Sequence, residues 1–116
     1  MQHSSLEPSD VKVLNEILHT CMLNQSAVKL KLKQYKDAIL LCDKVLSCNR
    51  KSAKAMYRRG QALFKTNEYD LALKDLSEAL SIVPNDKFII AELNVVKKAI
   101  HKYLVFEKCQ YRKMFK

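Results

Sequence analysis

The sequence is poor in the residues that end helices and build tight turns. Its 116 residues include one glycine and two prolines. A β-rich protein needs many more turn residues, so this composition favours an all-α fold. A chain of this length is expected to form one domain.

Several functional signals are also missing. No apolar run reaches the roughly 18–20 residues of a membrane helix, and the opening MQHSSLEPSD lacks the apolar core of a signal peptide. We therefore expect a cytoplasmic protein without a membrane partner. The three histidines are scattered, which predicts no metal site. Four cysteines lack CxxC spacing, so we expect reduced, structural thiols at Cys21, Cys42, Cys48 and Cys109.

Catalytic motifs are absent as well. The sequence contains no phosphate-binding glycine loop, no GxSxG and no HExxH. We expect no catalytic residues and no cofactor in this chain. The net charge of +9 favours acidic partners, but no aromatic platform or nucleic-acid motif accompanies it. Nucleic acid is therefore not an expected partner.

What the sequence does contain is a helix–turn–helix unit at Ala53–Pro84. Its apolar residues recur at helical spacing on both sides of a polar turn around Asn67. The unit has the 34-residue length of a tetratricopeptide repeat, TPR. Gly60 and Ala72 are small enough to let the two helices approach closely. The residues in the positions of the repeat signature are Met56, Arg59, Gly60, Leu63, Ala72, Leu76, Ala79 and Pro84.

A weaker copy of the same unit lies 34 residues earlier. Ser26 stands in the position of Gly60, Ala38 in that of Ala72, and Tyr35 in that of Tyr69. The chain is therefore predicted to hold two complete TPR repeats, with the first repeat of a longer array missing.

The predicted helices follow from this alignment. Ser9 is expected to cap a first helix that runs to Leu32, and Asp86 to cap a final helix that runs to Met114. Between them we predict helices at Tyr35–Ser47, Ala53–Lys65 and Tyr69–Ile82. The domain divides into a disordered start (1–8), a repeat with an extended first helix (9–52), a second repeat (53–86) and a long C-terminal capping helix (87–116).

The final helix is basic. Residues 87–116 carry eight Lys and Arg against two Asp and Glu. These cations are either the polar outer face that an end cap needs or a surface that binds calmodulin or another acidic partner. The residues concerned are Lys97, Lys98, Lys102, Lys108 and Arg112.

The first helix carries an apolar belt wider than one buried face. Val13, Ile17 and Leu23 lie on directions that the next repeat is not expected to cover. We predict self-association through this helix, or a covering helix from a partner. A tilt of the helix that buries these residues is the alternative.

Three polar residues are candidates for binding an anion. Lys54 and Arg58 are four residues apart, hence on one helix face, and Asn24 occupies the position of Arg58 one repeat earlier. Two cations and an amide suit a carboxylate. Ordinary surface residues would explain the pattern equally well.

Longer stretches resemble a known family. NQSAVKLKLKQYKDAI, SAKAMYRRGQALF and EKCQYRKMF are similar to the TPR region of the large immunophilins. The ending is most similar to the forty-kilodalton cyclophilins, and the likeness covers Cys21–Phe115. It implies a co-chaperone that binds the Glu-Glu-Val-Asp tail of the ninety-kilodalton heat-shock chaperone through a carboxylate clamp. Asn24, Lys54 and Arg58 match three clamp positions.

The chain departs from this family in two respects. The family has a further repeat that supplies a lysine and an asparagine, so two of five clamp residues have no counterpart here. Its prolyl isomerase domain is missing too. We therefore predict a non-catalytic adaptor that binds acidic tails weakly. The alternative is the TPR part of an isomerase whose catalytic domain lies upstream.

Overall fold

The computed structural model describes residues 7–114, which form five helices and no strand. These are α1 (Pro8–Lys31), α2 (Tyr35–Cys48), α3 (Ala53–Lys65), α4 (Tyr69–Ile82) and α5 (Lys87–Met114). The all-α prediction is confirmed, and the boundaries of α3 and α4 match those expected. Each of the three inner helices packs against its neighbours in the chain, and α1 also contacts α3.

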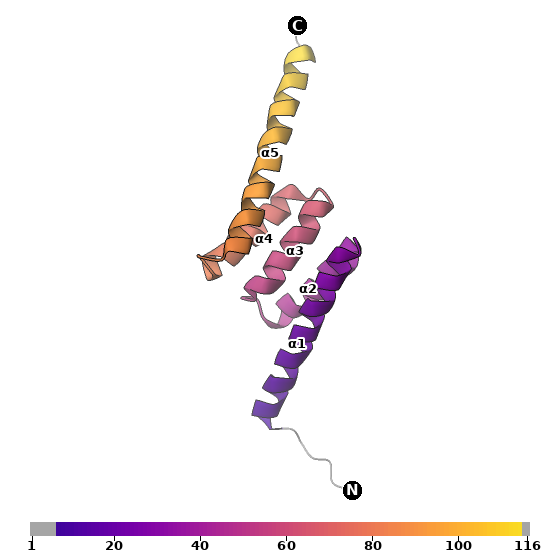
Figure 1. Cartoon of the computed structure of the whole chain (residues 1–116), viewed down its shortest axis with the longest axis vertical. Helices are drawn as coiled ribbons and strands as arrows, with labels where there is room; N and C mark the ends of the chain where they lie inside the picture. Colours follow the sequence, from indigo (N-terminus) through magenta and orange to yellow (C-terminus); the bar gives the residue numbers. More distant parts are fainter. Residues whose placement is uncertain (1–6, 115–116) are drawn as a thin grey trace.

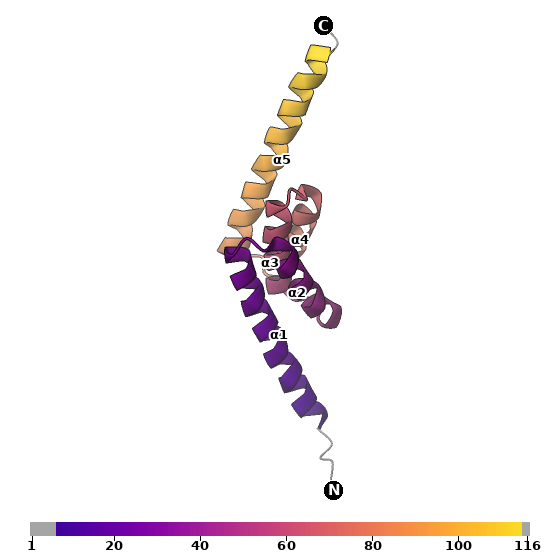
Figure 2. The same cartoon turned by 90° about the vertical axis from the view of Figure 1, so that its right-hand side faces the viewer.

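The helix pairs form a short stack from which the two outer helices project in opposite directions (Figures 1 and 2). The molecule measures 82 × 28 × 21 Å, with a radius of gyration of 18.7 Å. A compact domain of this length would have a radius of gyration of roughly 13 Å. The difference arises because α1 and α5 extend well beyond the helices that they cover.

The 34-residue period is visible in the backbone. Lys33 and Asn67, one period apart, both adopt left-handed conformations, with φ of 62° and 67°. Each follows the end of a first helix. The next amide bonds back to that helix in the same way, from Gln34 to the carbonyl of Lys29 and from Glu68 to that of Leu63, both at 2.8 Å. This pattern ends a helix and turns the chain sharply, so both repeats use one turn design.

Close packing within the second repeat depends on Gly60. A Cβ atom placed there would lie 2.9 Å from Cγ of Leu76 and 3.6 Å from the carbonyl oxygen of Ala72. The prediction that small residues bring α3 and α4 together is thus confirmed. Ser26, which has the position of Gly60 in the first repeat, is fully buried and donates its hydroxyl to the carbonyl of Leu23 at 2.6 Å.

The core is continuous along the stack. Leu23 lies with residues of α2 and α3, Met56 with residues of α4 and α5, and Leu76 with Leu93 and Val96 of α5. Among the side chains that are fully buried, those of Leu76, Val45 and Val96 are the largest apolar ones. The capping helix therefore covers the second repeat with its first half only.

Three predictions about the ends of the chain need correction. Ser9 is not the N-cap of α1, since Glu7 holds that position and Pro8 begins the helix. Proline suits a first helical position because it has no N–H group to leave unpaired. Pro8, which was expected to belong to a disordered start, lies in α1, and the rest of that expected segment up to residue 6 is outside the described part of the chain. Leu23 is buried, with 8% of its surface exposed, because it faces α2 and not the open side of α1.

Val13 and Ile17 do lie exposed, at 52% and 54%, so a tilt of α1 does not bury them. None of the described helices is apolar enough over a sufficient length to cross a membrane.

Candidate peptide-binding site

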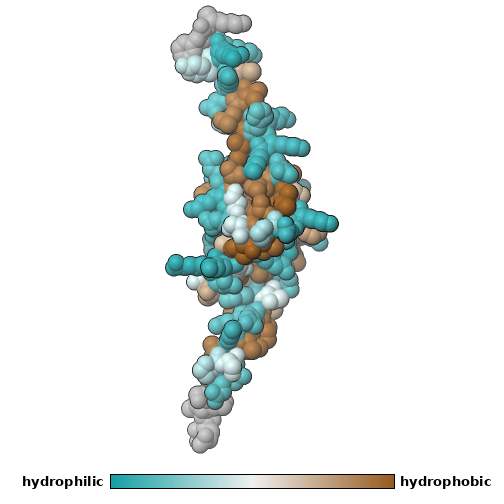
Figure 3. Space-filling model, turned by 90° about the vertical axis from the view of Figure 1, so that its left-hand side faces the viewer, coloured by the Kyte–Doolittle hydropathy of each residue, from teal (hydrophilic) through white to brown (hydrophobic). Residues whose placement is uncertain are grey.

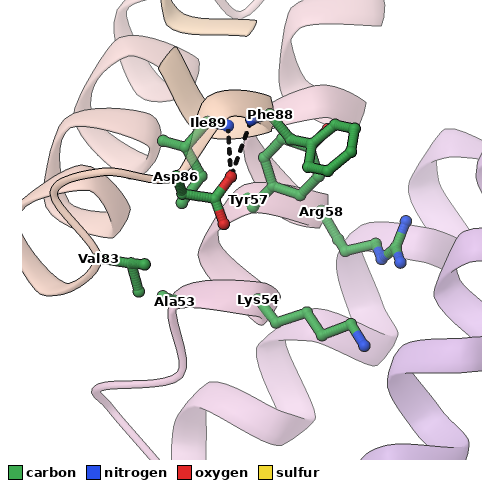
Figure 4. A pocket seen from close by; sticks show the side chains of 8 residues that line it. All are labelled: Ala53, Lys54, Tyr57, Arg58, Val83, Asp86, Phe88 and Ile89. Carbon is green, nitrogen blue, oxygen red and sulfur yellow. Dashed lines mark hydrogen bonds between the residues drawn. The ribbon is translucent and has the colours of Figure 1, made fainter. Parts of the chain in front are cut away.

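A cavity of about 460 Å³ opens between α3 and the start of α5. Lys54 and Arg58 line it, one turn apart on α3, and both side chains leave the helix in the same direction (Figure 4). Its other lining residues are Ala53, Tyr57, Val83, Asp86, Phe88 and Ile89. The cavity thus places two cations beside an apolar wall.

Arg58 has no carboxylate partner. Within residues 7–114 neither Lys54 nor Arg58 forms an ion pair. The Nε atom of Arg58 is buried and finds no hydrogen-bond acceptor among the described residues. A buried donor without an acceptor is costly, and a guanidinium of this kind is suited to receive an anion.

The neighbouring Arg59, unlike Arg58, forms ion pairs with carboxylates of the fold. Its Nε donates to Oδ2 of Asp75 at 2.7 Å, and its Nη1 donates to Oδ1 of Asp43 at 2.9 Å. The hydrogen bond to Asp75 contributes most to raising the pKa of Arg59 above its ordinary value. Arg59 therefore joins α2, α3 and α4 and is not available to a ligand.

Tyr57 and Asp86 complete the polar part of the cavity. Burial, followed by the charge of Glu92, raises the pKa of Tyr57, so its phenol stays neutral. Its hydroxyl accepts a hydrogen bond from Nε2 of Gln61 at 3.1 Å. Oδ1 of Asp86 accepts from the amides of Phe88 and Ile89 at 2.9 and 3.0 Å, which confirms Asp86 as the cap of α5.

Asn24, the third residue predicted for this site, is exposed on α1 and does not line the cavity. The contact between α1 and α3 puts it on the helix adjacent to Lys54 and Arg58. The structure thus brings two of the three candidates into one cavity and leaves the third on the neighbouring helix.

The apolar wall was not predicted from the sequence. Phe88 stands 34 residues after Lys54, in the same position of the repeat, and Glu92 stands 34 residues after Arg58. Sliding the alignment forward by one more period would therefore have identified the first turns of α5 as the continuation of the groove.

The remaining candidates lie elsewhere. The side chains of Lys97, Lys98, Lys102, Lys108 and Arg112 are all exposed along α5. Of the four cysteines, Cys42 is buried and the other three are exposed, and all four are free thiols. The prediction of structural thiols therefore holds for Cys42 alone. Burial raises the pKa of Cys42 to about 11. In the described part of the chain no group of His, Cys, Asp and Glu could hold a metal ion.

Comparisons with known proteins agree with this architecture. The family model of the tetratricopeptide repeat matches residues 53–86. The peptidyl-prolyl cis-trans isomerase FKBP4 of Bos taurus is 33% identical over 112 residues, which are 97% of this chain and 24% of the isomerase. The chain therefore spans about a quarter of the length of this relative. FKBP4 is a large immunophilin of the FKBP type, so the predicted likeness to that group is confirmed at the level of the TPR region.

Two solved structures share the fold. One is the first TPR of Spaghetti (RPAP3) bound to the HSP90 peptide SRMEEVD, with a TM-score of 0.68 and 28% identity over 72% of this chain and 66% of that chain. The other is the Hsp90 co-chaperone Cns1 from Saccharomyces cerevisiae, with a TM-score of 0.78 and 30% identity over 85% and 32%. The chain thus has the tetratricopeptide-repeat fold, and over almost its whole length it is similar in sequence to a large immunophilin.

Proposed function

We propose that this chain is a co-chaperone-type adaptor that binds an acidic C-terminal tail in the cavity between α3 and α5. The observation that carries the proposal is Arg58, an arginine in a cavity whose buried Nε has no hydrogen-bond acceptor, and whose side chain has no carboxylate partner, among residues 7–114. Lys54 adds a second cation one turn away. Similarity to a TPR bound to an HSP90 peptide and to an Hsp90 co-chaperone supports a heat-shock chaperone tail as the ligand.

The tail is expected to bind with its terminal carboxylate against Lys54 and Arg58, and with Asn24 donating from α1. The side chain preceding the carboxylate would face the apolar wall formed by Val83, Phe88 and Ile89. Two of five family clamp residues have no counterpart here, and each charge-assisted hydrogen bond contributes about 1.5–3 kcal/mol. The affinity should therefore be about a hundred- to ten-thousand-fold below that of a complete clamp.

Calorimetry with an acidic peptide that ends in a free carboxylate, against its amidated twin, tests the proposal. The free peptide should bind and the amidated one should not. Lys54→Ala and Arg58→Ala should abolish binding, whereas Lys65→Ala, which removes the same charge from the far end of α3, should leave it intact. Equal affinity for the two peptides would refute the clamp.

A second binding activity is proposed for α5. Residues 101–114 are exposed on every side, so the basic residues Lys97, Lys98, Lys102, Lys108 and Arg112 are open to an acidic protein such as calmodulin. Titration with calcium-loaded calmodulin tests this. A variant with Lys102 and Lys108 both changed to Glu should not bind, and wild-type protein that fails to bind would exclude the activity.

The isomerase alternative rests on the relatives, which are much longer than this chain. In that case the domain would direct an upstream catalytic domain to its chaperone, in the cytoplasm. We propose that such an isomerase would be of the cyclophilin type, and this rests only on the similarity of the C-terminal sequence EKCQYRKMF to the forty-kilodalton cyclophilins. The size of the endogenous protein, detected with an antibody against α5, distinguishes a 13.4 kDa adaptor from part of a longer enzyme.

A further inference from the structure

In the part of the chain that the structure describes, two helices carry exposed apolar faces at opposite ends of the molecule. The accessible surface is 8881 Å², against roughly 6,500 Å² for a compact monomer of this mass. Exposed large apolar side chains gather on the first half of α1 and on the projecting half of α5, residues 101–114. Figure 3 shows hydrophobic surface continuing from the repeats along α5 and a second hydrophobic area on α1.

The apolar face of α5 continues the face that packs on the repeats. Leu104 lies eleven residues, or about three turns, after buried Leu93, and Tyr103 lies seven after buried Val96. Both are more than half exposed, as is Met114 near the end of the helix. The same stripe that forms the core between α4 and α5 thus runs on into solvent.

Most of the apolar face of α1 points away from its own repeat, although Val11 at its edge lines a cavity with Cys48 and Asn49 at the end of α2. Leu14 lies nine residues, or about two and a half turns, before buried Leu23 and therefore on the opposite side of the helix. Val11, Leu14 and Leu18 follow one another at steps of three and four residues and are exposed at 42%, 51% and 50%. We call these three residues the outer face of α1.

The two faces match in length and in charge. Residues 8–21 of α1 and 101–114 of α5 each extend about 21 Å. Residues 7–21 carry three acidic side chains and one basic, whereas residues 101–114 carry four basic and one acidic, Glu107. The acids Glu7 and Asp10 stand at the free tip of α1, and the cations Arg112 and Lys113 at the free tip of α5.

We propose that the outer face of α1 is the docking site for the projecting half of α5 from a second copy of this chain. The two helices pair antiparallel, which places the acidic tip of α1 beside the basic tip of α5 and aligns their dipoles favourably. Different surfaces meet in this contact, so one copy keeps a free projecting half of α5 and the other a free outer face of α1. The cavity of Lys54 and Arg58 takes no part in it.

Sedimentation equilibrium tests the contact with variants that change only exposed residues. The weight-average mass of the wild-type protein should rise from 13.4 kDa to at least twice that value as the concentration approaches ~200 µM. Leu14→Lys and Leu104→Lys should each remain monomeric. Asn15→Lys and Val105→Lys are matched controls, because they add the same charge one residue away, off the apolar stripes, and should associate like the wild type. Unchanged circular dichroism shows that each variant is folded.

Mixing the two monomeric variants gives the decisive result. Leu14→Lys retains an intact α5 and Leu104→Lys an intact outer face on α1, so an equimolar mixture should form a dimer that cannot grow further. An interface of α1 with α1 would let Leu104→Lys dimerise on its own, and an interface of α5 with α5 would let Leu14→Lys do so, so in either case one of the two variants would not be monomeric. A monomeric mixture, or a wild-type chain that stays monomeric at ~200 µM, would overturn the proposal. Lys54→Ala and Arg58→Ala should not affect association.

Discussion

Arg59 binds Asp75 with two parallel hydrogen bonds, from Nε to Oδ2 at 2.7 Å and from Nη2 to Oδ1 at 2.8 Å. Asp75 is buried, with a side chain only 7% exposed, so its charge depends on this one arginine and on no water shell. The pair fixes α3 against α4, and a third bond to Asp43 adds α2. Adjacent Arg58 faces the cavity instead. One helix thus holds an arginine that ties the fold together and, beside it, the arginine to which the proposed function assigns binding.

Arg59→Ala should lower the free energy of unfolding by about 2–4 kcal/mol. Loss of one partner from a buried pair costs about 3–5 kcal/mol, and the partial exposure of Arg59 reduces this value. Arg58→Ala, the matched control one residue away, should change stability by less than about 1 kcal/mol. Urea unfolding followed by circular dichroism measures both. Equal losses for the two variants would contradict the division of roles.

Gly60→Ala should destabilise the domain by about 1–2 kcal/mol, although alanine is the better helix former. The new methyl group would lie 2.9 Å from Cγ of Leu76, a fully buried side chain. Because the branch point of Leu76 cannot move without its neighbours, overpacking outweighs the gain in helix propensity. Thermal unfolding of Gly60→Ala beside the exposed-helix variant Ser77→Ala would reveal the effect. A higher melting temperature for Gly60→Ala than for the wild type would show that α4 can shift to make room for the methyl group.

Lys33→Asn should stabilise the protein by about 0.4–1 kcal/mol. Lys33 has a left-handed backbone, with φ of 62°, which costs lysine more than it costs asparagine. The second repeat already has an asparagine in the equivalent position, Asn67, with φ of 67°. Asn67→Lys is the mirror-image control and should lose a similar amount in urea unfolding. Stabilisation by both variants would rule out backbone strain as the cause.

Cys42 should resist alkylation in the folded protein. Burial raises its pKa to about 11 from an ordinary 9.0, so at pH 8 ionisation alone makes it about a hundredfold less reactive than an exposed thiol. Mass spectrometry after iodoacetamide treatment should find three modified cysteines in buffer and four in urea. Because the folded state keeps this proton longer, the contribution of Cys42 to stability should fall as the pH rises from about 9 to about 11. Modification of Cys42 at the rate of Cys48 would contradict the assignment.

Helical spacing and the 34-residue period were sufficient to predict the repeats. They placed α3 and α4 at their observed boundaries and identified Gly60, because these features depend on contacts within one repeat. The period also placed Lys54 and Arg58 on one face of α3. The second wall of the cavity was missed because the repeat alignment was not extended beyond the second repeat: Phe88 belongs to the first turn of α5, and Val83 to the connection before it.

Exposure at the ends was harder to predict than the repeats. The apolar residues of α1 form two faces, and only the packing of α2 decides that Leu23 is buried while Leu14 is not. Likewise, the apolar residues of α5 keep their helical spacing as far as Met114. The contact of α5 with the second repeat, however, ends near Ile100. Periodicity gives the direction of an apolar face but does not reveal whether a neighbour is present to cover it.

Asp86 offers the sharpest test of the electrostatics of the cavity, because its carboxylate caps α5 and also lines the proposed binding site. Asp86→Asn keeps an oxygen that can accept from the amides of Phe88 and Ile89, since asparagine is as good an N-cap as aspartate. It removes a negative charge that opposes an acidic tail. Calorimetry should therefore give about two- to fivefold tighter binding of the free-carboxylate peptide.

Asp86→Ala separates the two roles of this residue. It removes the same charge but also the cap, so it should cost about 1 kcal/mol of stability in urea unfolding, whereas Asp86→Asn should cost little. Binding of the amidated peptide should remain undetectable in both variants, because the gain requires a ligand carboxylate close to Lys54 and Arg58. Weaker binding of the free peptide by Asp86→Asn would show that Asp86 contacts the tail directly, and the orientation proposed here would then be wrong.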